Sequence, residues 1–156
     1  MNRQTALALT AGVFTAIWTY VSLQIVPVLS PWVGVAAMGC TFATGGKAQG
    51  FQRAVFATLS GVVYVWVMMQ LLPMLGSSTL MYALLMGVVA LVIVIMSRAP
   101  ALSFMPGAFV GAAVTVGNGA GGDLGHLLYT AVSLVIGAAL GFAAETTAAS
   151  LATSRR

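Results

Sequence analysis

Charged side chains are scarce in this sequence. Of its 156 residues, six are Lys or Arg and two are Asp or Glu, which together make 5% of the chain. A soluble globular domain carries roughly 25% charged residues. Hydrophobic residues make up 60% of the sequence. Because so few charges cannot form a water-exposed surface, we expect an all-α polytopic membrane bundle whose outer surface faces lipid.

Side chains that carry out catalysis or bind metals are also few. The chain has one Cys (Cys40), one His (His126), one Asp (Asp123) and one Glu (Glu145). A single Cys excludes an intrachain disulfide and a Cys-rich metal site. Catalysis needs several such groups in a defined arrangement, so we expect no enzymatic activity, no cofactor and no metal. Asp123 suits the start of a helix, where its side chain can cap free backbone N–H groups.

The stretch "GNGAGG" at residues 117–122 fits the pattern G-x-G-x-x-G of dinucleotide-binding turns. In that site the glycines follow a buried strand, and an acidic residue comes about 20 residues later. Here they follow an apolar run, and the acid at such a distance is Glu145, at the far end of the next run. We therefore predict a flexible loop and no nucleotide ligand.

Six apolar runs lie between sequence breakers. They cover residues 5–27, 29–45, 51–73, 79–96, 101–117 and 124–144. A helix that crosses the hydrocarbon core needs about 20 mostly apolar residues. The runs 29–45 and 101–117 are short and rich in Gly, Ala and Pro, so each is either a short crossing helix or an interrupted helix buried by its neighbours.

Basic residues favour six crossings. With six spans and the N-terminus inside, every basic residue falls on the cytoplasmic side, as the positive-inside rule requires. These residues are Arg3, Lys47, Arg53, Arg98, Arg155 and Arg156. We therefore predict a multi-pass protein with both termini cytoplasmic. Since the basic residues are scattered rather than clustered on one helix face, nucleic acid is not an expected partner.

The middles of the predicted spans hold no ionisable residue. Proton- or sodium-coupled transporters commonly place carboxylates or His there, so strong coupling is disfavoured. Small residues, hydroxyls and aromatic rings in or beside the two short runs are our candidates for lining a solute pathway. These candidates are Thr41, Phe42, Thr44, Phe104, Pro106, Phe109, Gly111, Thr115 and Asn118. The alternative is that the hydroxyls bond only their own helix backbone.

Two pairs of glycines at G-x-x-x-G spacing predict close helix packing. They are Gly107 with Gly111 and Gly137 with Gly141. Another glycine pattern, G-x5-G, occurs twice. Its two copies, at residues 39–45 and 111–117, are 72 positions apart (39 to 111). Segments 5–73 and 79–144 are therefore expected to be two three-helix repeats of opposite orientation within one domain, 1–156.

The segments "WVGVAAMGCTFATGGKAQGF" (32–51) and "LSFMPGAFVGAAVTVGNG" (102–119) resemble a family of small bacterial inner-membrane proteins known as domain of unknown function 1097. The resemblance runs along nearly the whole chain and implies a bacterial inner-membrane location without implying an activity. The second segment also looks like the interrupted-helix segments of urea-type channels, which is an analogy of fold only.

Two functions agree with these features. The first is a passive channel or facilitator for a small polar, uncharged solute of the size of urea or ammonia, assembled as a homo-oligomer that buries the small-residue faces. The alternative is an accessory or scaffold subunit that carries no solute and binds another membrane protein through those faces.

Overall fold

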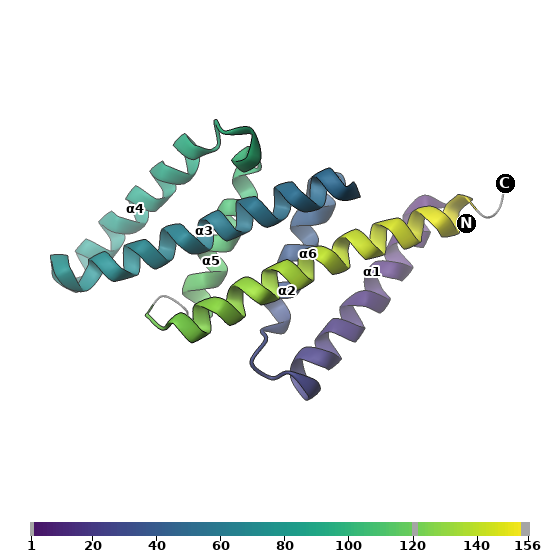
Figure 1. The fold of residues 1–156 in the computed structure, drawn as a ribbon, viewed down its shortest axis with the longest axis horizontal. Helices are drawn as coiled ribbons and strands as arrows, with labels where there is room; N and C mark the ends of the chain where they lie inside the picture. The colour runs from purple at the N-terminus through teal and green to yellow at the C-terminus, as the bar shows by residue number, and fades with distance from the viewer. Residues whose placement is uncertain (1, 120–121, 154–156) are drawn as a thin grey trace.

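The computed structural model describes residues 2–119 and 122–153, and within these ranges the chain is helical and contains no β-strand (Figure 1). The helices are α1 (Arg3–Tyr20, continued by a π-helical turn, Val21–Ile25), α2 (Pro31–Ala43), α3 (Lys47–Leu75), α4 (Thr79–Met96), α5 (Met105–Gly117) and α6 (Leu124–Thr153), with a 3-10 turn at Pro100–Leu102. The expected all-α bundle of six helices is confirmed for the described residues.

Three helix ends lie four or more residues from the ends of the predicted apolar runs. One is the start of α5, at Met105 rather than at Ala101. Helix α3 begins at Lys47 rather than at Phe51, and α6 runs to Thr153 rather than ending at Ala144. Apolar runs locate only the part of a helix that faces lipid, whereas backbone hydrogen bonding continues into polar sequence. The loop predicted at "GNGAGG" is confirmed at its described residues, since α5 ends at Gly117 and α6 begins after Asp123. Residues 120 and 121 lie outside the described ranges.

Helix lengths fall into two classes. Four helices are long and apolar enough to cross a membrane, whereas α2 and α5 have 13 residues each. At 1.5 Å per residue, 13 residues span about 20 Å, which is about 10 Å less than the hydrocarbon core of a bilayer. The polar backbone groups at the ends of α2 and α5 must therefore be buried by protein or must line a cavity.

The two halves of the chain are intertwined. Each short helix packs mainly on the long third helix of the other half, α2 on α6 and α5 on α3. The first helix of each half lies outside this centre, with α1 on α6 and α4 on α3. Helices α3 and α6 run in opposite directions across the middle of the bundle, and α1 begins at the end where α6 finishes (Figure 1). The arrangement is that of two inverted three-helix units.

The two short helices match residue for residue at a shift of 74 (31 to 105). Both the helix bounds and every buried position agree at this shift. The buried residues of α2 are Val33, Gly34, Ala37, Met38, Cys40 and Thr41, and those of α5 are Gly107, Ala108, Gly111, Ala112, Val114 and Thr115. The shift of 72 predicted from the glycine frame was wrong, because Gly39 is exposed with nothing near it while Gly111 is buried.

The long third helices also correspond, at a shift of 76 (61 to 137), where every buried residue of α3 except Gly50 has a buried counterpart on α6. Gly61 on α3 lies so close to α5 that an added Cβ would overlap the carbonyl oxygen of Ala108. A Cβ on Gly137 of α6 would likewise overlap the carbonyl oxygen of Gly34 on α2. The two interfaces between the halves are therefore backbone-to-backbone contacts that only glycine permits.

Helix α1 is tied to this centre more firmly than α4 is. The Trp18 ring lies over Gly34, and its indole N–H donates to the carbonyl of Pro31 at 2.8 Å. The Thr10 hydroxyl lies 3.0 Å from the carbonyl oxygen of Ala144 on α6. Helix α4 is held instead by apolar side chains, with only Val89 and Ile93 buried.

Candidate functional site

A polar cluster joins the ends of the two short helices. The Ser30 hydroxyl, just before α2, donates to the side-chain oxygen of Asn118, just after α5, at 2.6 Å. The amide nitrogen of Asn118 donates in turn to the hydroxyl of Thr130 on α6 at 2.7 Å. One turn further along α6, the Ser133 hydroxyl accepts from the backbone N–H of Ser30 at 3.2 Å. Thr130 and Ser133 are fully buried, so these hydrogen bonds satisfy groups that would otherwise be costly to bury.

An open pocket of about 380 Å³ lies over this cluster. We call it the distal pocket, because it lies at the end of the bundle opposite the start of α1. It is lined by Pro27, Val28, Ser30, Asn118, His126 and Tyr129. The amide, hydroxyl, phenol and imidazole groups offer both donors and acceptors. The pocket can therefore hydrogen-bond a small polar molecule without placing a full charge at its base.

Asp123 and His126 stand at the rim of the distal pocket and are both exposed. A side-chain oxygen of Asp123 accepts from the backbone N–H of His126 at 3.1 Å and lies 2.8 Å from Nδ1 of its ring. The pKa of Asp123 lies below its usual range. The largest cause is the hydrogen bond from the backbone N–H of His126, and the hydrogen bond with the His126 ring comes next. The predicted capping role of Asp123 is confirmed. Within the described ranges, no three His, Cys, Asp or Glu side chains lie close enough to hold a metal ion.

The base of the distal pocket is closed. Behind the polar cluster lies an apolar core that includes Val33, Val62, Val114 and Leu134, all buried. These side chains come from α2, α3, α5 and α6, so all four central helices meet there. A polar solute that enters the distal pocket cannot pass this core unless the helices move.

A second pocket of about 250 Å³ lies at the other end of the bundle. We call it the proximal pocket. It is lined by Gln49, Gln52, Arg53, Phe56, Pro100 and Ala101. Three residues after Ala101, the Phe104 ring lies against Gly107, and the side chain of Ala57 lies near the same glycine.

The other residues predicted to line a pathway lie in three different settings. Thr41 and Thr115 are buried in helix contacts, where Thr41 lies 3.2 Å from the carbonyl oxygen of Ala138 and Thr115 donates to Gly111 at 2.7 Å. Thr44 bonds the backbone of its own turn and of Gly50. Phe109 and Pro106 are exposed on the outer face, and Phe42 is half-buried. Only Asn118 lines the distal pocket.

The four glycines predicted to pack helices lie at interfaces. A Cβ on Gly111 would overlap the carbonyl oxygen of Thr58, and one on Gly141 would press against Met38 and Thr41. Gly107 lies beneath the Phe104 ring. The half-buried carboxylate of Glu145 lies against Gly46, at the turn before α3.

Sequence reasoning missed several residues of the distal pocket, namely Ser30, Tyr129, Thr130 and Ser133. Their positions carry one usable signal. Thr130 and Ser133 are three residues apart, so they share one face of α6. Ser30 precedes a proline that starts a helix. Nothing in the sequence, however, indicates that this face of α6 meets the start of α2.

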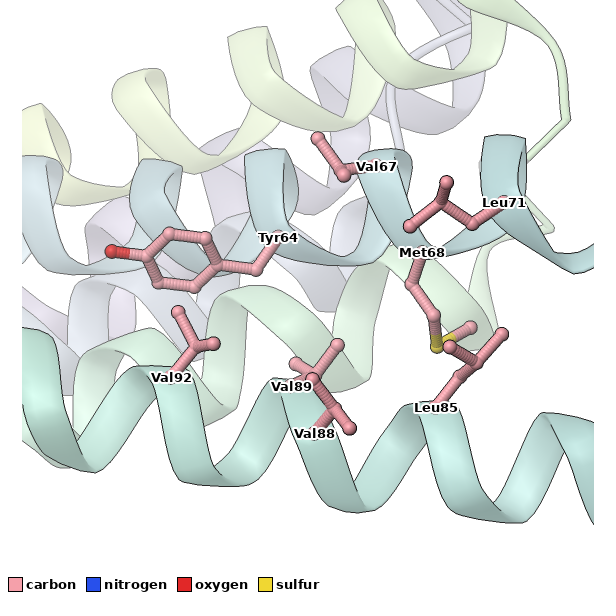
Figure 2. Close-up of a pocket in the computed structure, with 8 residues that line it drawn as sticks. All are labelled: Tyr64, Val67, Met68, Leu71, Leu85, Val88, Val89 and Val92. Carbon is pink, nitrogen blue, oxygen red and sulfur yellow. The ribbon is translucent and has the colours of Figure 1, made fainter.

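An apolar groove of about 160 Å³ separates α3 from α4. Figure 2 shows the residues that line it, which are Tyr64, Val67, Met68, Leu71, Leu85, Val88, Val89 and Val92. The Tyr64 hydroxyl is the single side-chain polar group among them. This groove suits apolar chains rather than a hydrogen-bonding solute.

Comparison with known proteins places the chain in a family. The family model described as "Protein of unknown function (DUF1097)" matches residues 8–149. The chain is 31% identical over 118 residues to inner membrane protein YcdZ of Escherichia coli K12, covering 74% of this chain and 70% of the relative. It is 28% identical over 158 residues to inner membrane protein YcdZ of Salmonella typhimurium LT2, covering 99% and 93%. No solved structure matches. The chain, a helical membrane protein, therefore belongs to the DUF1097 family.

Proposed function

We propose that the protein is a facilitator of the bacterial inner membrane for a small polar, uncharged solute, and that the solute enters at the distal pocket. The observation that carries this proposal is the hydrogen-bonded chain Ser30–Asn118–Thr130 at the base of that pocket. The inner-membrane location follows from the names of the two relatives.

The chemistry of the pocket favours a neutral solute. Its base offers amide and hydroxyl groups, and the charged Asp123 stands exposed at the rim, paired with His126. A charged solute would lose most of its hydration at the base without meeting an opposite charge, which is costly. A urea-like or ammonia-like molecule exchanges its hydrogen bonds to water for bonds to Ser30 and Asn118.

The short helices support the same proposal. Because α2 and α5 fall about 10 Å short of a full crossing, the polar cluster between their ends lies deeper than the ends of the long helices. Irregular backbone at such depth is tolerated where it lines a water-filled cavity. In this proposal the protein carries out passive transport, with no enzymatic step, no cofactor and no ion coupling.

The test is stopped-flow light scattering on proteoliposomes, with urea, glycerol, ammonia and formate as solutes. We expect faster equilibration for at least one neutral solute and loss of that acceleration with Asn118→Leu. Thr146→Val is the matched control, because this exposed hydroxyl on α6 bonds only its own helix. Acceleration that survives Asn118→Leu would remove the distal pocket from the pathway, and acceleration of formate alone would overturn the neutral class.

A second candidate function is an accessory subunit, and one observation favours it. Helix α4 exposes several large apolar side chains and is held to the bundle along one side only. In that case the groove between α3 and α4 would receive another membrane protein. The discriminating measurement is co-purification in mild detergent, where a stoichiometric second protein supports the accessory subunit. A defined assembly of this chain alone supports the homo-oligomer that we propose for the facilitator.

A further inference from the structure

We infer that the two halves of the chain exchange conformations, so that the proximal pocket opens toward the centre of the bundle when the distal pocket closes, with Phe104 as the proximal gate. This inference rests on the proposed function and makes the protein a carrier with alternating access rather than an open channel.

The two pockets occupy equivalent places in the two halves. Each is bounded by the segment that leads into a short helix and by the first turns of the long helix of the other half. Pro27 of the distal pocket corresponds to Ala101 of the proximal pocket at the shift of 74 (27 to 101). Tyr129 corresponds to Arg53 at the shift of 76 (53 to 129). One fold thus carries the same pocket twice, once at each end of the bundle.

The two ends differ at one equivalent pair. At the distal end, Ser30 and Asn118 are hydrogen-bonded and line the pocket. Their counterparts at the shift of 74 are Phe104 (30 to 104) and Thr44 (44 to 118). There the Phe104 ring lies on Gly107, which also has Ala57 as a neighbour, and Thr44 bonds only nearby backbone. The equivalent position thus holds a hydrogen-bonding residue at the distal end and an aromatic ring at the proximal end.

The interfaces between the halves permit the exchange. Helix α2 lies on α6 through Gly34 and Gly137, and α5 lies on α3 through Gly111 and Gly61. Surfaces built from glycine and small residues present few interlocking side chains, so one helix can shift along the other with little repacking. Small sliding of packed helices is an established way for proteins to switch between two states.

The turn between α2 and α3 holds an unusual backbone conformation. Between α2 and α3, Gly45, Gly46 and Lys47 all have positive φ, of 82°, 61° and 53°. A positive φ is unfavourable for Lys, and residues held this way often mark segments that change conformation. In the proposed exchange, Lys47 leaves the left-handed region when the proximal pocket opens.

The test is cysteine labelling of Ala57, which is fully buried and lies, like the Phe104 ring, beside Gly107. In a Cys40→Ala background, Ala57→Cys is reconstituted and treated with a membrane-impermeant maleimide from the proximal side. We expect slow labelling, accelerated about tenfold or more when Phe104→Ala is added. Ala101→Cys, at the exposed rim of the proximal pocket, is the control and should react at the same rate with and without Phe104.

Equal labelling of Ala57→Cys with and without Phe104 would overturn the gate. Phe104→Ser, which copies the equivalent Ser30, should accelerate labelling as Phe104→Ala does, and it serves as the readout if the alanine variant does not fold. Solute flux is measured in the same proteoliposomes. Faster labelling with no flux of any solute would contradict the proposed function and leave the gate standing. Flux in the parent protein with unchanged labelling would overturn the gate alone.

Discussion

Ser30 and Asn118, 88 residues apart in the sequence, meet through a 2.6 Å hydrogen bond between the Ser30 hydroxyl and the Asn118 amide oxygen. One residue precedes α2 and the other follows α5. The contact joins the two halves of the chain at the point where α2 begins and α5 ends, and it forms the base of the distal pocket.

The buried hydroxyl of Thr130 should contribute measurably to stability. Thr130→Val keeps the shape of the side chain but removes the acceptor of the Asn118 amide. Leaving a buried donor unsatisfied costs about 1–3 kcal/mol. We expect a corresponding fall in the free energy of unfolding in detergent. Thr146→Val, which removes an exposed hydroxyl from the same helix, should change it far less, and equal losses would mean that the polar cluster adds no stability.

Two glycines that look alike in the sequence should respond in opposite ways to alanine. Gly111→Ala places a methyl group on the carbonyl oxygen of Thr58, whereas Gly39→Ala places one in open space. Overpacking costs typically about 1–3 kcal/mol, and alanine in a free helix position is neutral or stabilising. The measurement is the melting temperature of each variant, which should fall for Gly111→Ala and stay the same or rise for Gly39→Ala. A destabilised Gly39→Ala beside an unaffected Gly111→Ala would contradict the packing of α5 on α3.

Both ends of the chain should face the cytoplasm. Helix α1 begins and α6 ends at the same end of the bundle (Figure 1), and Arg3, Lys47, Arg53 and Arg98 lie at that end, as the positive-inside rule requires. We expect a reporter that is active only in the cytoplasm to function when it is fused after Arg156. A reporter inserted at Ser77, between α3 and α4, should function only outside. Cytoplasmic termini place the distal pocket on the outer side of the membrane. The reverse reporter pattern would place it on the cytoplasmic side.

The cap formed by Asp123 should make stability depend on pH in the acid range. Its pKa is lowered in the folded protein, first by the backbone N–H of His126 and then by the imidazole. A lowered pKa gives stability that is complete above the unfolded value of about 3.9 and is lost as pH falls through the folded value. The gap in melting temperature between the protein and Asp123→Ala should therefore be present at neutral pH and should close below about pH 3.9.

His126→Gln separates the two causes of this shift. The variant keeps the backbone N–H of residue 126 and loses only the imidazole. We expect the pKa of Asp123, followed by NMR of its carboxyl carbon, to rise part of the way toward its ordinary value. A complete return would show that the imidazole alone lowers the pKa.

The sequence by itself determined that this is a helical membrane protein. Too few charges exist to cover a soluble surface, and the apolar runs locate all six helices, including the two short ones. The capping role of Asp123 could also be predicted, because a cap is a local interaction between neighbouring residues. Helix ends in polar sequence, such as that of α6 after Ala144, could not be located from hydrophobicity.

Only the tertiary structure decided which helix faces pair. In water, a polar face and an apolar face reveal the buried side of a helix, but in lipid the outer face is apolar too, so the pattern carries no such signal. Exposed Gly39 and buried Gly111 therefore look equivalent, and Thr41 and Thr115 look like pathway residues although they lie in helix contacts. The meeting of Ser30, Asn118 and Thr130 depends on the packing of each short helix on the opposite half, a long-range arrangement that no local pattern encodes.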